Sequence, residues 1–211
     1  MELIQELGTD TLLKFIGACI AIYLAPGLDT MFIVSNGVAG GARVGLASAL
    51  GVAVGTCIHV IAAVLGLTLI IKTYPILYDA IKYTGAAYLA YLAVLAWKNK
   101  SDNILNKYGE TRIMVAFRRG ILSNLLNPKV AIFVFAFLPQ FIPAESHNYS
   151  LSFALLGLVF VLGTLIFDGA AGVLSGYASE TIVKWLRNTA YLNKFSAIVL
   201  MIICVHVLAI A

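Results

Sequence analysis

Long apolar stretches, each sufficient to cross a lipid bilayer, are the feature that most limits how this chain folds. A bilayer core of about 30 Å needs about 20 apolar residues per helix. Hydrophobic residues make up 61% of the chain and charged residues 11%, against roughly 25% charged in soluble domains. The sequence therefore predicts an all-α integral membrane protein with six transmembrane helices, near residues 12–36, 41–71, 77–97, 118–139, 150–175 and 193–211.

The basic residues gather in two of the predicted loops, and this sets the expected orientation. Loops rich in Lys and Arg stay in the cytoplasm, so segments 98–119 and 176–194 are expected there. Segment 139–150 has no Lys or Arg and fits the opposite side. Six spans then place both termini outside, on the periplasmic side, and only Lys72 and Lys82 disagree with the rule. The clustering also accounts for the net charge of +4, so no nucleic-acid partner is expected.

Several classes of function find no support in the sequence. Gly-x-Ser-x-Gly, His-Glu-x-x-His, Cys-x-x-Cys and a phosphate-binding glycine loop are all absent, so neither enzymatic activity nor a cofactor is expected. Cys19, Cys57 and Cys204 fall inside apolar segments, where a thiol behaves as a small hydrophobe, and no disulfide framework is expected. The start of the chain carries Glu2 and Glu6 rather than basic residues, so no cleaved leader is expected.

One polar stretch, "KNKSDNILNKYGETR" at 98–112, divides the chain into two halves. We expect a single transmembrane domain made of repeat 1, about 10–97, a cytoplasmic linker, 98–117, and repeat 2, about 118–211. Three helices per half mean that the second repeat runs with inverted orientation relative to the first. Secondary transporters repeatedly use two inverted repeats.

The first apolar segment of each half is interrupted by a proline. Pro26 and Gly27 break the first, and Asn127 and Pro128 break the fourth. Proline lacks an N–H and clashes with the preceding turn, so carbonyls near Tyr23, and near Asn124 in the other half, lose their partners and become available. Paired interruptions of this kind point to a transporter's binding site. The alternative is that both prolines only kink helices for packing.

Three ionisable residues, Asp29, Lys129 and Asp168, lie inside predicted spans. An ionised group at the bilayer centre costs from about 3 to above 10 kcal/mol, so these residues must face protein or water. One alternative is a structural ion pair between Lys129 and either carboxylate. Buried pairs stabilise poorly once desolvation is counted, so two carboxylates around one lysine favour a functional polar cavity.

Small residues recur on the second and fifth predicted helices. Gly51, Gly55 and His59 share one face of the second, with Thr56 beside them. We expect Thr56 and His59 to line the cavity, with His59 hydrogen-bonded rather than bound to a metal, since no second ligand lies at metal-site spacing. Glycines that follow Asp168 predict close helix packing. Such close contacts would serve a homodimer equally well, so the oligomeric state stays open.

The segment "FRRGILSNLLNPKVAIFVFAFLPQF", 117–141, resembles the central signature of the LysE/RhtB family of amino-acid exporters, with its Phe-x-x-Gly, Asn-Pro-Lys and Leu-Pro-Gln-Phe elements in order. The segment "APGLDTMFIVSNGVAGGARVGLASALGVAVG", 25–55, resembles the family's N-terminal signature. Leu28 stands where that pattern usually has a second proline, so we expect a shallower break there. The resemblance points to the same candidate residues, which are Pro26, Gly27, Asp29, Asn127, Pro128, Lys129 and Asp168.

The resemblance implies proton-coupled export, by an antiporter of the bacterial inner membrane, of small amino acids such as homoserine, threonine or lysine. Lys129 and a helix N-terminus would meet the carboxylate of the substrate. Its ammonium would be met by Asp29 or Asp168 and by freed carbonyls. Protonation of one carboxylate would release the ammonium, and we prefer Asp168 as the proton carrier over Asp29.

Three alternatives remain. A divalent-cation exporter of the same superfamily would need facing acids with no buried cation near them, and Lys129 argues against it. A membrane thiol oxidoreductase would need a cysteine near each break, but only Cys19 precedes one of them. A non-transporting scaffold would have no use for two charged helix breaks.

Overall fold

The computed structural model describes residues 7–25, 27–67, 70, 73–98, 110–143, 146, 148–177 and 190–209. Its regular elements are helices throughout these ranges, which confirms the expected all-α class. They are α2 (Thr9–Leu24), α3 (Leu28–Gly40), α4 (Ala42–Ala62), η1 (Ala63–Leu67), α6 (Pro75–Lys98), α7 (Ile113–Leu125), α8 (Pro128–Ile132), η3 (Phe133–Phe137), η4 (Leu138–Phe141), α9 (Tyr149–Gly176) and α11 (Ala190–Ala209). Segments η1 and η3 are π-helical and η4 is a 3₁₀ turn.

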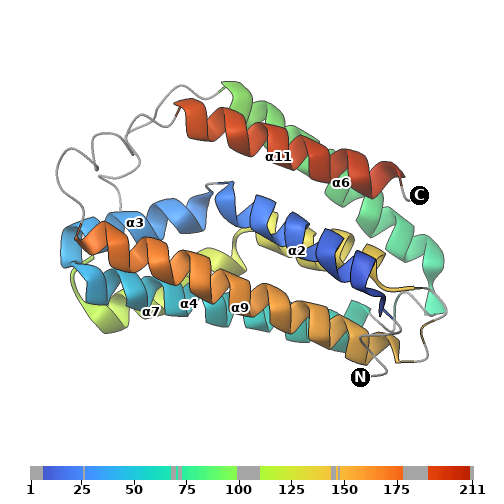
Figure 1. Cartoon of the computed structure of the whole chain (residues 1–211), viewed down its shortest axis with the longest axis horizontal. Coiled ribbons are helices and arrows are strands. Elements are labelled where there is room, and N and C mark those ends of the chain that lie inside the picture. Colours follow the sequence, from blue (N-terminus) through green and yellow to red (C-terminus); the bar gives the residue numbers. More distant parts are fainter. Residues whose placement is uncertain are drawn as a thin grey trace.

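The helices run lengthwise between two ends of the molecule (Figure 1). We call one the linker end, where α3 meets α4, α7 begins and α9 finishes. The other is the terminal end, where α2 begins, α9 begins and α11 finishes (Figure 1). Helices α6 and α11 pack together along one side, while α4, α7 and α9 form the other. Helix α2 lies between these layers and contacts both α9 and α11.

Some helices of this bundle are long and apolar enough to span a membrane. Ala42–Leu67 and Tyr149–Gly176 are each long and apolar enough to cross a bilayer. Two bent pairs of helices also meet this criterion if each pair is counted as one span. They are Thr9–Leu24 with Leu28–Gly40 and Ile113–Leu125 with Pro128–Phe141. Helices also stand at the third and sixth expected positions. The six-span arrangement of two inverted repeats stays a prediction.

Both expected helix breaks are present. The axes of α2 and α3 meet at 53°, and the helices on either side of Asn127 meet at 52°. The expectation of a break shallower than in relatives stays a prediction. Ala25 and Gly27 are both extended, so the helix is already interrupted before Leu28, and Leu28 itself begins α3. A second proline is not needed for a full bend.

Helix α4 carries its large side chains on the outside and its small and polar ones inside. Leu46, Leu50, Val54 and Ile58 are each about two-fifths exposed, whereas Ser48 and Thr56 are fully buried. Such a pattern suits a helix that faces lipid. The inward glycines let backbones approach closely, since a methyl group on Gly45 would overlap the Gly172 carbonyl of α9. The prediction that these glycines serve packing is confirmed for this pair.

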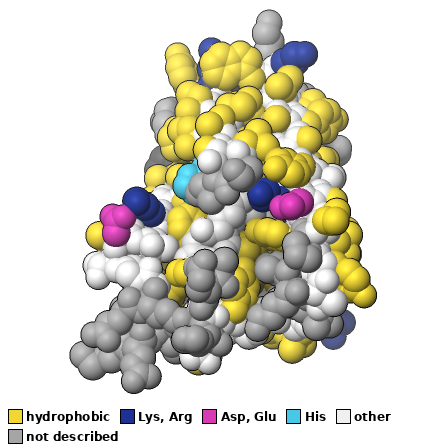
Figure 2. Space-filling model, turned by 90° about the vertical axis from the view of Figure 1, so that its right-hand side faces the viewer, with side chains coloured by type: hydrophobic (Ala, Val, Ile, Leu, Met, Phe, Trp, Pro, Cys, Tyr) yellow, Lys and Arg dark blue, Asp and Glu magenta, His cyan; other side chains and the backbone are white. Residues whose placement is uncertain are grey.

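The terminal end has an aromatic core beneath a largely hydrophobic surface. The rings of Phe133 and Phe160 stack at 4.5 Å, and Phe15 meets the ring of Phe141 edge-on at 5.2 Å. Viewed from this end, hydrophobic side chains predominate over the upper part of the molecule, and adjacent basic and acidic side chains lie across its middle (Figure 2).

Candidate functional site

The first helix break exposes the end of one helix and the start of the next. Helix α2 ends at Leu24, the extended residues Ala25 and Gly27 follow, and α3 begins at Leu28. Pro26 lies outside the described residues. A helix leaves its last carbonyls and its first N–H groups without intrahelical partners. The break therefore offers a partly negative end of α2 and a partly positive start of α3.

Asp29 is the second residue of α3 and is only 6% exposed. Its Oδ1 accepts a hydrogen bond from the Ser123 hydroxyl at 2.8 Å. Its Oδ2 accepts from the side-chain amides of Asn124 and Asn127, each at 2.8 Å. Three donors and the start of a helix stabilise the carboxylate. All three donors come from the second half of the chain, at or next to its own break.

Asn127 shapes the second break. Its backbone is extended (φ −83°, ψ 105°), and its Oδ1 accepts from the backbone N–H of Lys129 at 3.0 Å, which caps the start of α8. Pro128 occupies the first position of α8, where a missing N–H costs nothing. Asn127 thus caps one half's helix with its oxygen and holds the other half's Asp29 with its nitrogen.

Lys129 reaches the opposite side of the first break. Its ammonium donates to the Ala25 carbonyl at 2.8 Å and to the Ile22 carbonyl at 3.3 Å. No ion pair to Lys129 occurs among the described residues, so the expected alternative of a structural ion pair is absent from this conformation. The prediction of freed carbonyls near Tyr23 is confirmed at Ile22. The Asn124 carbonyl keeps a backbone partner, since it accepts from the Asn127 N–H at 2.9 Å, and the His59 ring contacts it at 3.2 Å.

The two charges are therefore held crosswise. A charge from each half meets polar groups of the other half's break. Between them lies a cavity of about 30 Å³, about the volume of one water. Its polar lining comprises Tyr23, Asp29, Thr30, Asn124, Lys129, Thr164 and Asp168, and its apolar lining comprises Ile22, Val52, Val130 and Phe160. The structure thus brings together Asp29, Lys129 and Asp168, as the sequence predicted.

Asp168 differs from Asp29 in its surroundings. It lies on α9 and is half-buried, and no hydrogen bond or ion pair to its side chain is found within the described part of the chain. A carboxylate that lines a cavity without a fixed partner is free to change its protonation state or its partner. Of the two carboxylates, Asp168 fits a titrating role better than the triply bonded Asp29.

Thr56 and His59 do not line this cavity. The Thr56 hydroxyl donates to the Val52 carbonyl at 3.1 Å, within its own helix. His59 is buried, and its Nε2 contacts the Asn124 carbonyl at 3.2 Å. The expected hydrogen bond of His59 is therefore confirmed, while the cavity in this conformation ends one turn earlier, at Val52. Their place as lining residues of a wider cavity stays a prediction.

Sequence reasoning missed two residues that hold Asp29, namely Ser123 and Asn124. The signal was available, because Asn124 lies three residues before Asn127 in "SNLLNP". Two amides at that spacing in an apolar segment share one helix face. Asn124 is fully buried, and its Oδ1, beside Gly55, has no hydrogen-bond partner in the residues that are described.

The linker end is closed by tight packing. A methyl group on Gly51 of α4 would overlap the Phe117 carbonyl of α7. Nearby, the Glu110 backbone N–H donates to Asn36 Oδ1 at 3.3 Å, which joins the start of α7 to α3. The Glu110 carboxylate receives the Arg112 side chain at 3.1 Å, and this hydrogen bond and charge hold the pKa of Glu110 at about 2, below its usual 4.5.

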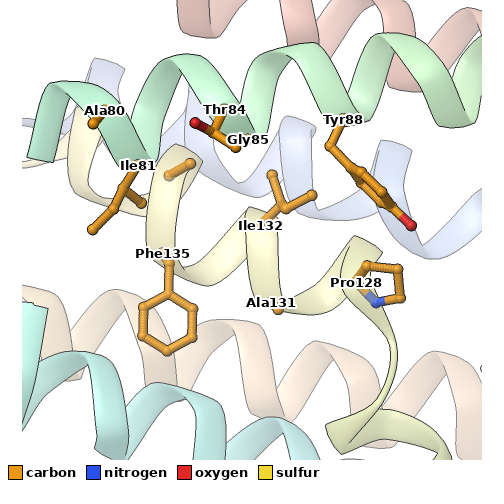
Figure 3. Close-up of a pocket in the computed structure, with 10 residues that line it drawn as sticks. Ala80, Ile81, Thr84, Gly85, Tyr88, Pro128, Ala131, Ile132 and Phe135 are labelled. Atoms are coloured by element: carbon orange, nitrogen blue, oxygen red, sulfur yellow. The ribbon is translucent and has the colours of Figure 1, made fainter.

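A larger groove, of about 600 Å³, lies between α6 and α8 with η3 (Figure 3). Ile81 and Tyr88 of α6 face Pro128 and Ile132 across it (Figure 3). Its lining is apolar apart from Thr84 and the Tyr88 hydroxyl, and contains no charged residue. Pro128 and Ile132 lie on the face of α8 turned away from the charged cavity. The groove therefore offers no charged side chain that could bind a charged substrate.

Metal and thiol chemistry gain no support from the described residues. They contain no group of three or more His, Cys, Asp or Glu side chains arranged to hold a metal ion. Cys19, Cys57 and Cys204 are free thiols. The two carboxylates beside the cavity share it with the Lys129 ammonium, as the sequence indicated for an organic rather than a metallic substrate.

A family model and several individual relatives match this chain over most of its length. Residues 20–210 match the family model described as LysE type translocator. A Bacillus subtilis (strain 168) membrane protein, YrhP, is 30% identical over 198 residues, covering 89% of this chain and 92% of the relative. The leucine efflux protein of Klebsiella pneumoniae is 29% identical over 192 residues (90% of each chain), and that of Salmonella typhimurium 31% over 179 residues (78% and 82%). No solved structure matches.

Proposed function

Because the chain belongs to the LysE type translocator family, we propose that it exports a zwitterionic α-amino acid across the bacterial inner membrane, coupled to proton entry. The observation that carries this proposal is the crosswise arrangement at the two breaks. A cation, two carboxylates and the carbonyls at the end of a helix surround one cavity inside an apolar bundle. Both poles of an amino acid find a counterpart there.

The ammonium of the substrate suits the carbonyl end of α2 together with Asp168. Ile22 and Ala25 present their carbonyls at that end, and the helix dipole favours a cation there. The carboxylate of the substrate suits the Lys129 ammonium. Asp29, with three fixed donors, serves to lock the two breaks together and to balance the charge of Lys129.

Asp168 is the proposed proton carrier. When ionised it helps to hold the ammonium of the substrate, and when protonated it loses that attraction. A proton entering from outside would therefore favour release to that side. The support for this role is that Asp168 lines the cavity and has no fixed hydrogen bond within the described residues.

The names of the relatives and the lining of the cavity suggest candidate substrates. Two of the relatives carry the name leucine efflux protein, and the cavity wall includes the apolar residues Val52, Val130 and Phe160. Leucine therefore joins threonine, homoserine and lysine as a candidate substrate. Since the cavity has room for about one water, the bundle must open before any of them enters.

The test is transport by purified protein in proteoliposomes. We expect counterflow of at least one labelled amino acid from a panel of leucine, threonine, homoserine and lysine, and faster efflux when a pH gradient is imposed. Asp168→Asn should bind the substrate more weakly, keep counterflow at saturating substrate, and lose the stimulation by the pH gradient. Asp79→Asn is the matched control, because it removes an exposed carboxylate of α6 that lies away from the cavity.

Two results would overturn the proposal. Transport of manganese or cadmium with none of the amino acids would identify a metal exporter instead. Full stimulation by the pH gradient in Asp168→Asn would move proton coupling to another group.

A further inference from the structure

Within the described residues, the hydrogen bonds of the Lys129 ammonium go to backbone carbonyls. Its ammonium donates to the carbonyls of Ala25 and Ile22, at 2.8 and 3.3 Å, where α2 ends. Carbonyls at a helix C-terminus lack intrahelical partners and carry partial negative charge, so they attract cations. A primary ammonium at this position makes the same contacts that the ammonium of an amino acid would make.

Neither nearby carboxylate draws the Lys129 ammonium away from these carbonyls. Asp29 is engaged by three donors from Ser123, Asn124 and Asn127. Asp168 lines the same cavity but is not ion-paired to Lys129 in the described structure. Two neutral acceptors therefore hold the ammonium, and an unengaged carboxylate across the cavity offers it a second position.

The Lys129 ammonium and the ammonium of a substrate cannot occupy the carbonyl end of α2 at the same time, because the space is too small. The cavity beside Lys129 measures about 30 Å³, which is about one water. A substrate ammonium can reach the Ala25 carbonyl only if the Lys129 side chain leaves it. Gly27 adds to the fit, because a methyl group there would lie 3.1 Å from Lys129 Nζ and 3.3 Å from its Cε.

We propose that Lys129 is a tethered stand-in for the substrate's ammonium, which occupies the carbonyl end of α2 when the carrier closes without an amino acid. This inference rests on the proposed export function and deepens it. When a substrate enters, its ammonium takes the carbonyls of Ile22 and Ala25. Lys129 then turns toward Asp168 and the carboxylate of the substrate.

The consequence concerns the mode of transport. A carrier that satisfies its own carbonyls can close and return without cargo, so it performs net efflux. A carrier that needs a bound ammonium to close can only exchange one amino acid for another. Lys129 therefore decides between net efflux and obligatory exchange.

The first experiment measures binding without transport. In Lys129→Ala, the vacated carbonyls should accept a small free ammonium. We expect about 100 mM ethylammonium to raise the melting temperature of this variant by about 3 °C, given an affinity near 10 mM. Tetramethylammonium, which has no N–H to donate, should not. Neither ion should shift wild type, where Lys129 holds the carbonyls, or Lys129→Met, where an uncharged chain fills the space.

The second experiment separates net efflux from exchange. In Lys129→Ala we expect both modes to weaken, because the contact with the carboxylate of the substrate is lost, but net efflux should fall at least tenfold further than counterflow at saturating substrate. Ethylammonium should restore part of the net efflux. Gly27→Ala, which crowds the Lys129 ammonium, should show the same split more weakly and keeps the test open if Lys129→Ala does not fold. Gly17→Ala is the control, since a methyl group there meets nothing within 4 Å.

The outcomes are distinguishable. Equal losses of net efflux and counterflow, with no ethylammonium effect, would reduce Lys129 to a partner of the substrate carboxylate and overturn the inference. Unchanged transport in both modes would make Lys129 structural and overturn it too. If wild type moves no amino acid, the proposed function fails, whereas the ethylammonium shift of Lys129→Ala would still establish the stand-in role.

Discussion

Two substitutions of Asp29 separate its charge from its hydrogen bonds. In Asp29→Asn, the new amide oxygen can take the place of Oδ2 and accept from Asn124 and Asn127. The new NH₂ group then lies where Oδ1 was, and the Ser123 hydroxyl can turn to accept from it. All three hydrogen bonds survive without the charge. In Asp29→Ala, the same three donors lose their acceptor.

The expected magnitudes follow from burial. Asn124 is fully buried and Asn127 is 2% exposed, so Asp29→Ala strands two buried amide donors. Each costs about 1–3 kcal/mol, or about 2–6 kcal/mol for the pair. The value should lie toward the lower end, because an unfolded chain in the membrane finds other partners. Asp29→Asn should cost about 1 kcal/mol, since weaker neutral hydrogen bonds are offset by the relief of a buried charge.

The assay combines stability and transport in the same preparations. Thermal unfolding in detergent should rank wild type close to Asp29→Asn and well above Asp29→Ala. Counterflow should be abolished in Asp29→Asn despite normal folding, because the charge that balances Lys129 is gone. If Asp29→Ala proved as stable as Asp29→Asn, the triple hydrogen bond would not join the two breaks. Wild-type counterflow in Asp29→Asn would show that the charge itself is dispensable.

Two further predictions concern the linker end and the contact between α4 and α9. Gly45→Ala should destabilise the protein by about 1–3 kcal/mol in thermal unfolding, because the added methyl overlaps the Gly172 carbonyl, whereas Gly17→Ala should not; equal stability of the two would refute the close approach. The pKa of Glu110 is lowered from 4.5 to about 2, so its contribution is present above about pH 4.5 and is lost as the pH falls through 2. Wild type should therefore lose stability over that range relative to Glu110→Gln, and parallel pH profiles would contradict the contact with Arg112.

The sequence predicted the elements of this site better than their contacts. Prolines and charges in apolar segments are rare and costly, so the breaks at 26–29 and 127–129 could be found without a structure. The structure brings Asp29, Lys129 and Asp168 to one cavity, as expected. Asn124 could be found as a second amide on the face of Asn127, but its pairing with Asp29 could not, because that depends on how the two halves dock. The alternative of a structural ion pair with Lys129 is not found among the described residues, where amides hold Asp29 and carbonyls hold Lys129.

Two features of the site depend on local structure. The first break bends as far as the second, because the extended backbone at Ala25 and Gly27 interrupts the helix without a second proline. Thr56 and His59 share a helix face with Gly55, as periodicity predicted. Helical spacing fixes a face but not the depth at which a cavity stops, and here it stops at Val52.

The π-helical segments carry a consequence for how such chains vary. An i→i+5 turn holds one residue more than an i→i+4 turn over nearly the same rise. Removing one residue from Ala63–Leu67 or from Phe133–Phe137 would therefore restore an ordinary α-helix and leave the flanking faces in phase. A deletion of one residue within one of the described α-helices would rotate everything beyond it by about 100°. Among the described helices, these two segments are thus the places where length variation of a single residue can be absorbed.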